Sequence, residues 1–88
     1  TKWSIFPNPV FEGTFSVKFD QTLVLGEENM VIEATDLSGK VVMTQEYTQG
    51  DVVGGNRILV KHNLAAGTYT LSAKHVDFTS AQNFVVTR

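Results

Sequence analysis

The sequence contains no cysteine among its 88 residues. The domain therefore has neither disulfide bonds nor thiolate metal ligands. It also lacks an excess of positive charge, because seven Lys and Arg stand against nine Asp and Glu and give a formal net charge of −2. A face that binds nucleic acid needs a surplus of basic residues, so we exclude nucleic acid as the partner. No apolar run approaches the ~20 residues of a membrane-spanning helix, and no segment resembles an N-terminal signal peptide.

A sustained 3.6-residue hydrophobic period is missing as well, so the sequence predicts essentially no helix. A period of two is present instead. Phe15, Val17 and Phe19 are apolar and alternate with polar residues after Gly13, which is the pattern of a half-buried strand. With 42% hydrophobic and 18% charged residues, the chain has the composition of one globular domain, residues 1–88, with a small core.

A tight turn at Asp36-Leu37-Ser38-Gly39-Lys40 organises the middle of the chain. It separates an alternating run, Met30 to Thr35, from a β-branched run, Lys40 to Thr48. Asp36 can accept hydrogen bonds from backbone N–H groups of the turn, and Gly39 allows a positive φ. The pattern predicts a β-hairpin whose apolar face needs a second layer to cover it.

A second local signal is the corner Leu64-Ala65-Ala66-Gly67-Thr68-Tyr69. A strand follows it, with Tyr69, Leu71 and Ala73 on one face. A tyrosine just after a Leu-x-x-Gly corner resembles the tyrosine corner of Greek-key sandwiches, in which the hydroxyl bonds back to the backbone of the corner.

The end of the chain predicts a turn over Val76 to Ser80 and a last strand over Gln82 to Thr87, with Phe84 and Val86 facing inward. About seven short strands with turn signals between them are typical of an all-β, immunoglobulin-like antiparallel β-sandwich.

The connections carry clear breaking signals. Pro7-Asn8-Pro9 fixes two φ angles and removes two donors, so we expect a rigid turn or a sheet edge there. Asp20 to Asn29 is interpreted as a short strand or loop. Gln49-Gly50-Asp51 and Gly54-Gly55-Asn56 indicate a flexible connection.

Few residues suggest chemistry. His62 and His75 each follow a lysine, which is the pattern of a solvated rim, and two histidines without a tight motif do not make a zinc site. Glu27, Glu28 and Asp51 could join a calcium site, but no Asp-x-Asp-x-Asp-Gly loop is present, so we interpret them as solvated loop charge. We expect no catalytic residue, no metal and no cofactor, and therefore not an enzyme.

Four aromatic residues fall outside the best core pattern: Trp3, Phe11, Tyr47 and Phe78. They could form a strip on which sugars stack. An accessory carbohydrate-binding module, or a plain spacer, of a secreted glycoside hydrolase or adhesin is therefore an alternative function. The spacer hypothesis predicts further sequence after Arg88.

Four pieces occur in a fixed order: Phe6-Pro7-Asn8-Pro9, Asp36-Leu37-Ser38-Gly39-Lys40, Leu64-Ala65-Ala66-Gly67-Thr68-Tyr69, and the closing strand Phe84-Val85-Val86-Thr87-Arg88. This order and spacing resemble the type A C-terminal sorting domain of the type IX (Por) secretion system of Bacteroidetes. The resemblance covers nearly the whole chain. The start at Thr1 agrees with a piece cut from a longer secreted protein.

The resemblance implies a non-catalytic delivery role. Such a domain stands last in a secreted protein, folds as an immunoglobulin-like sandwich in the periplasm and is recognised by the type IX outer-membrane translocon. A sortase-like peptidase commonly removes it, and the N-terminal cargo reaches the cell surface or the medium.

The resemblance also implies which residues carry the signal, through three structural motifs and the end of the chain. The matching residues are Pro7, Asn8 and Pro9 at the sheet edge near the cargo junction; Asp36, Gly39 and Lys40 in the middle hairpin; Leu64, Gly67 and Tyr69 in the corner; and Lys74, Phe84, Val86 and Arg88 as candidates for translocon contact.

Overall fold

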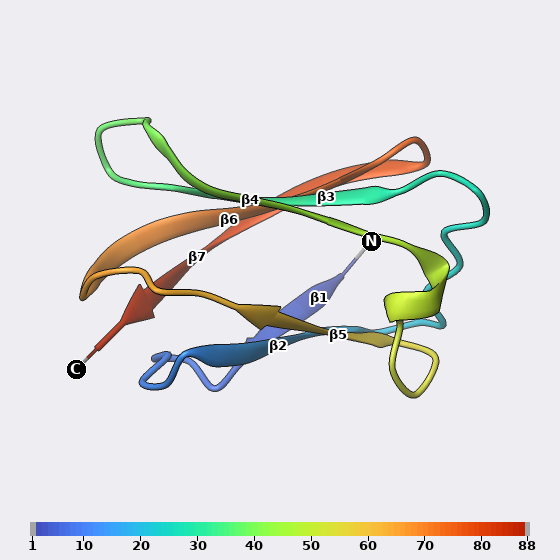
Figure 1. Cartoon of the computed structure of the whole chain (residues 1–88), viewed down its shortest axis with the longest axis horizontal. Helices are drawn as coiled ribbons and strands as arrows, with labels where there is room; N and C mark the ends of the chain where they lie inside the picture. Colours follow the sequence, from blue (N-terminus) through green and yellow to red (C-terminus); the bar gives the residue numbers. More distant parts are fainter. Residues whose placement is uncertain (1, 88) are drawn as a thin grey trace.

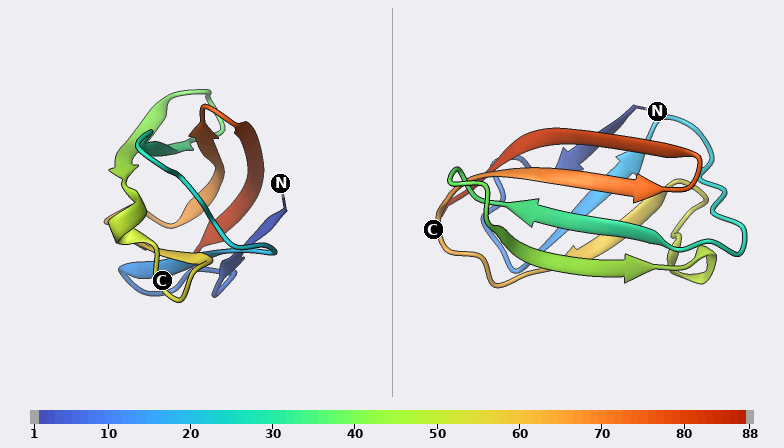
Figure 2. Two further views of the ribbon diagram at one scale, coloured as in Figure 1. Left: turned by 90° about the vertical axis from the view of Figure 1, so that its right-hand side faces the viewer. Right: turned by 90° about the horizontal axis from the view of Figure 1, so that it is seen from above.

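Two antiparallel sheets packed face to face make up the computed structural model, which describes residues 2–87 (Figure 1). One sheet has the strand order β1-β2-β5 and the other β4-β3-β6-β7, the sheet nearer the viewer in the right-hand view of Figure 2. The strands are β1 (Trp3–Phe6), β2 (Thr14–Phe19), β3 (Met30–Thr35), β4 (Val41–Tyr47), β5 (Arg57–Lys61), β6 (Gly67–His75) and β7 (Phe78–Val86). The predicted all-β, immunoglobulin-like sandwich is confirmed.

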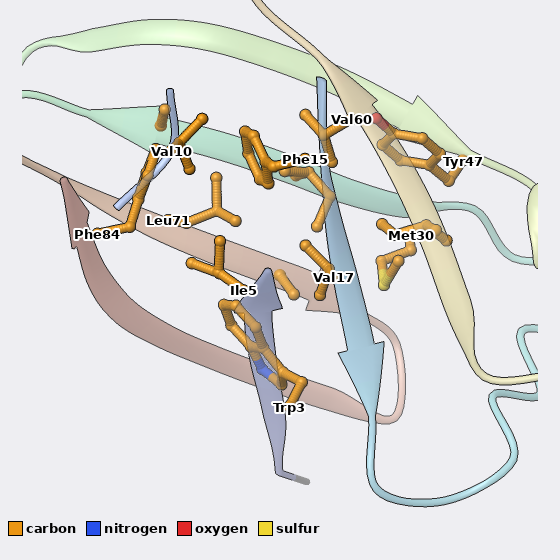
Figure 3. Close-up of a cluster of buried hydrophobic side chains, with 14 of the residues drawn as sticks. Trp3, Ile5, Val10, Phe15, Val17, Met30, Tyr47, Val60, Leu71 and Phe84 are labelled. Carbon is orange, nitrogen blue, oxygen red and sulfur yellow. The ribbon is translucent and has the colours of Figure 1, made fainter. Parts of the chain in front are cut away.

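The core fills the space between the two sheets (Figure 3). The alternation of β2 places Phe15, Val17 and Phe19 inward, each at most 2% exposed. From the facing sheet, Leu71 and Phe84 are equally buried, and the rings of Phe15 and Phe84 lie 5.4 Å apart. Burial of one such side chain contributes roughly 1.5–3 kcal/mol, so the period-two pattern decides which face of each strand is inside.

The last hairpin differs from the expectation. The turn is confined to Val76 and Asp77, and β7 begins at Phe78 rather than at Gln82. Phe78 pairs with His75, and its ring packs 6.0 Å from the ring of Phe19. This long-range packing extends the strand through a segment whose local composition predicts a turn.

The segment between β2 and β3 forms no strand, although Leu23 and Leu25 are buried. Gln49 secures it, because its Nε2 donates to the Leu23 carbonyl at 3.0 Å and its Oε1 accepts from the Leu25 N–H. Gln49 begins the one 3₁₀ turn among residues 2–87, η1 (Gln49–Asp51). The prediction of essentially no helix is confirmed, whereas the first part of the expected flexible connection is a hydrogen-bonded turn.

Glutamine side chains also link the two sheets at both open sides of the sandwich. Gln45 on β4 donates through Nε2 to the Lys61 carbonyl of β5 at 2.6 Å. Gln82 on β7 donates in the same way to the Trp3 carbonyl of β1 at 2.6 Å. Each bond satisfies a carbonyl on an edge strand, which leaves less of that edge open to another chain.

Candidate functional site

The hairpin between β3 and β4 is built by one carboxylate and one glycine. Asp36 Oδ1 accepts from the Ser38 N–H at 2.9 Å, the Ser38 hydroxyl at 2.6 Å and the Lys40 N–H at 3.0 Å. The Ser38 hydroxyl and the Lys40 N–H hold the pKa of Asp36 below its usual value, because both stabilise the charged form. Gly39 has φ +90°, which a side chain would oppose. The predicted turn is confirmed, and the Asp36 carboxylate is committed to it.

The corner before β6 is a tyrosine corner, as predicted. The Tyr69 hydroxyl donates to the Ala65 carbonyl at 2.6 Å, and the ring lies 5.7 Å from the ring of Phe84. Leu64 and Tyr69 are buried. The hydroxyl therefore fixes the path of the chain into β6, while the ring packs on β7.

Pro7-Asn8-Pro9 is the point at which the chain passes from one sheet to the other. Both peptide bonds that precede the prolines are cis. β1 pairs with β2, whereas Val10 forms a parallel bridge with Val86 of β7. The Val10 N–H donates to the Val85 carbonyl at 2.7 Å, the Thr87 N–H donates to the Val10 carbonyl at 2.7 Å, and Asn8 Oδ1 accepts from the Val85 N–H at 3.4 Å. The segment thus holds the end of the last strand.

These three motifs and the end of β7 lie at the same end of the sandwich, the left end in Figure 1. Gly67 pairs with Val86, and Thr35, next to the hairpin, pairs with Thr70. A shallow hollow of about 320 Å³ joins the hairpin to the start of β6. We call this region the motif end; it comprises residues 7–10, 36–40, 64–69 and 85–87.

The four candidates for translocon contact have different surroundings. Phe84 and Val86 are 1% and 3% exposed, so their side chains belong to the core of the folded domain. Lys74 lies towards the other end of β6, where its Nζ is 2.8 Å from Glu33 Oε1. Arg88 lies outside the described residues. The side chains that β7 exposes next to the motif end are those of Asn83 and Val85.

The expectation that the histidines lie in a solvated rim is wrong for His75. His75 is 9% exposed and His62 is intermediate. In each ring, Nε2 faces a carbonyl, of Leu25 at 2.9 Å or Glu12 at 2.7 Å. A carbonyl only accepts, so Nε2 carries the proton, and Nδ1 accepts from the N–H two residues later in the chain. Both rings are structural links between distant segments.

The described residues offer no metal centre. Within residues 2–87, no three His, Asp or Glu residues come together as a metal-binding group. Glu27 and Glu28 are exposed loop residues, whereas Asp51 is an exposed residue of η1 whose Oδ2 accepts from the Thr48 N–H at 2.8 Å. In the same part of the chain, no helix has the length and apolar character needed to cross a membrane.

The aromatic strip of the carbohydrate-binding alternative is not formed. Trp3 and Tyr47 are each 7% exposed, and Phe78 packs against the core. Burial, followed by the charge of Asp51, raises the pKa of Tyr47 to about 12. Of the four aromatic residues, Phe11 alone is largely exposed, at 62%. The expectation that these residues lie outside the core is therefore wrong for Trp3 and Tyr47 and right for Phe11. Trp3 lies on a short edge strand whose burial depends on the facing sheet.

Comparison with known proteins gives the chain its family context. The model of the family described as the secretion system C-terminal sorting domain matches residues 4–87. Among solved structures, the chain is similar to PorZ of Porphyromonas gingivalis, with 16% identity and a TM-score of 0.62. The match covers 98% of this chain and 11% of that one. PorZ is described as an essential bacterial surface component of the type-IX secretion system. At this identity the likeness shows the fold alone, and no curated protein matches the chain.

Proposed function

The chain belongs to the family of secretion system C-terminal sorting domains, and we propose that it directs an N-terminal cargo through the type IX translocon. In this proposal, residues 1–88 form a single C-terminal domain of a larger secreted protein and catalyse no reaction. The translocon recognises the folded domain, and a sortase-like peptidase removes it at the surface. The cargo then reaches the cell surface or the medium.

The observation that supports this proposal best is the meeting of the sequence motifs at one end of the sandwich. Residues 7–10 hold the last strand through three hydrogen bonds, and Gly67 pairs with Val86. Motifs far apart in the sequence thus stabilise one small region that includes the end of β7. A sorting signal that is recognised on the folded domain needs such a rigid surface.

The direction of β1 favours access to that surface. Trp3 pairs with Phe19, at the end of β2 that lies away from the motif end, and β1 then runs towards Pro7. A cargo joined ahead of β1 leaves the motif end facing away from the junction. The resemblance implies a place near the cargo junction for Pro7, Asn8 and Pro9, but they follow the end of β1 that is remote from it. In our proposal this segment acts on the last strand instead.

The roles of the motif residues follow from their contacts. Asp36, Gly39 and Tyr69 shape the backbone, and Phe84 and Val86 seal the core beneath it. In our proposal the translocon touches the exposed groups above them, Lys40, Asn83 and Val85 among them, together with Arg88. Lys74, which is paired with Glu33, contributes through the outer face of β6.

The proposal is tested by fusing residues 1–88 to the C-terminus of a periplasmic reporter in a host with an active type IX system. We expect the reporter at the cell surface, and we expect it to stay in the periplasm when residues 83–88 are deleted. Asn29→Ala serves as a control, because Asn29 is exposed and lies at the opposite end of the domain. A reporter fused to this variant should be delivered normally. A reporter that stays periplasmic with the intact, folded domain contradicts the proposal.

A further inference from the structure

The strands of the three-stranded sheet carry exposed positive charge and no acidic residue, although the exposed acids Glu12 and Asp20 flank β2 in the sequence. Lys18 on β2 and Arg57 and Lys61 on β5 are exposed. β1, β2 and β5 contain no Asp or Glu. We call the exposed side of these strands the basic sheet face. It stands out in a chain whose formal net charge is −2.

The register of this sheet brings two of the cations together. Lys18 lies directly opposite Arg57 in the β2–β5 pair, where side chains of neighbouring strands are close and like charges destabilise the sheet. Among residues 2–87, neither of them, nor Lys61, forms an ion pair. In the other sheet, by contrast, the charge of Lys74 is paired with that of Glu33 at 2.8 Å. The positive charge of the basic sheet face is therefore left without a partner within the described domain.

Two exposed apolar side chains lie between the cations. Phe6 is 72% exposed and Leu59 is 49% exposed. Phe6 pairs with Ser16, and Ser16 pairs with Leu59, so the three side chains form one row across the sheet. The row lies between the Lys18–Arg57 pair and Lys61, since side chains on one face of a strand alternate with a period of two. Exposed aromatic and aliphatic groups bordered by cations are typical of surfaces that contact lipid headgroups.

We propose that the basic sheet face binds a membrane surface that carries anionic phosphate headgroups. Charge complementarity supports this occupant, because cations near such a surface are attracted by its negative potential. A sheet of three short strands presents a broad face, so Phe6 and Leu59 can enter the headgroup layer while the cations contact phosphates. Asp51 in η1 and Asp77 in the β6–β7 turn lie outside this sheet and disfavour binding through the faces that carry them. The inference goes beyond the sorting function and does not depend on it.

The proposal is tested by cosedimentation of residues 1–88 with vesicles of phosphatidylglycerol and phosphatidylcholine, and with vesicles of phosphatidylcholine alone. We expect binding to the anionic vesicles only, weakening as salt rises. Each cation near the surface strengthens binding roughly fivefold, so Lys18→Ser/Arg57→Ser should weaken it on the order of 20-fold. Lys40→Ser/Lys74→Ser makes the same change in net charge away from the face and should change binding by less than about threefold.

Thermal unfolding separates loss of binding from loss of structure. Because like charges opposite each other destabilise a sheet, Lys18→Ser/Arg57→Ser should melt no lower than the parent although its vesicle binding is weakened. Phe6→Ser/Leu59→Ser should weaken vesicle binding with the charge unchanged. Equal vesicle binding by Lys18→Ser/Arg57→Ser and Lys40→Ser/Lys74→Ser contradicts the proposal. Binding to soluble polyphosphate without binding to anionic vesicles also contradicts it, and assigns the face to a soluble polyanion.

Discussion

The side-chain oxygen of Asn8 accepts a hydrogen bond from the backbone N–H of Val85 at 3.4 Å, across 77 positions of the sequence. It stands beside the two bonds of Val10 with the same strand end. The segment that leaves β1 therefore ends against the outer edge of β7. This relationship explains the place of Pro7-Asn8-Pro9 in the domain, because the two prolines set the bend that brings Asn8 and Val10 to the last strand.

The Asn8 bond should contribute measurably to stability. Asn8→Ala removes one acceptor from the Val85 N–H and should lower the free energy of unfolding by about 0.5–1.5 kcal/mol. Urea denaturation followed by circular dichroism measures this change. Asn29→Ala, which loses only an exposed side-chain bond to Glu46, is the matched control and should change stability by less than about 0.5 kcal/mol. Equal effects of the two variants would show that Asn8 does not hold the strand end.

Adjacent residues of β7 should respond in opposite ways to a new charge. Phe84 is 1% exposed and Val85 is 38% exposed. Phe84→Asp places an unpaired charge in the core and should unfold the domain or cost several kcal/mol, whereas Val85→Asp should leave it folded with a small change in melting temperature. A melting temperature unaffected by Phe84→Asp would mean that Phe84 does not face the core.

Asp36 should titrate below the ordinary range of an aspartate. The Ser38 hydroxyl is the main cause of its lowered pKa, followed by the Lys40 N–H. A carboxyl whose pKa is lowered by folding stabilises the folded state in full when the pH is above 3.8, the pKa of the unfolded state. That contribution is lost as the pH falls through the lowered pKa. Side-chain NMR titration should show the low value in the parent and a shift back towards 3.8 in Ser38→Ala. If the pKa of Asp36 is the same in Ser38→Ala as in the parent, the Ser38 hydroxyl is not the cause of the lowered pKa.

Tyr47 should make the domain sensitive to strong alkali. Burial, with the charge of Asp51, raises its pKa from 10.0 to about 12. The neutral form is favoured in the folded state, so this stabilising contribution is complete below pH 10 and is lost as the pH rises from 10.0 through about 12. Unfolding by urea at several pH values across that window measures the loss. Tyr47→Phe, which cannot ionise, should show a flatter pH dependence over the same window.

The sequence predicted the features that depend on neighbours in the chain. The faces of β2 follow from the alternation of Phe15, Val17 and Phe19, and the hairpin turn follows from Asp36 and Gly39, because both rules are local. The start of β7 was missed because Phe78 is held by Phe19, far away in the sequence.

The burial of His75 was missed although the inward alternation of β6 continues to it, because the lysine that precedes it is typical of a solvated rim. The bond of its ring to the Leu25 carbonyl, across 50 positions, is the part that no local pattern reports. The four sequence motifs were visible as motifs, but their meeting at one end depends on the pairing of Val10 and Gly67 with Val86. That pairing is a property of the sheet order and not of any single segment.

The central claim is that the motif end, and not the domain surface in general, is the address for export. It is tested most directly by the surface-exposed fraction of a reporter fused to two matched variants. Val85→Asp changes an exposed valine beside the motif end, and Val76→Asp changes one in the β6–β7 turn at the opposite end. Provided that both domains melt like the parent, the account predicts a severalfold loss of surface reporter for Val85→Asp and normal delivery for Val76→Asp. Equal delivery of the two variants, or loss of both, would contradict it.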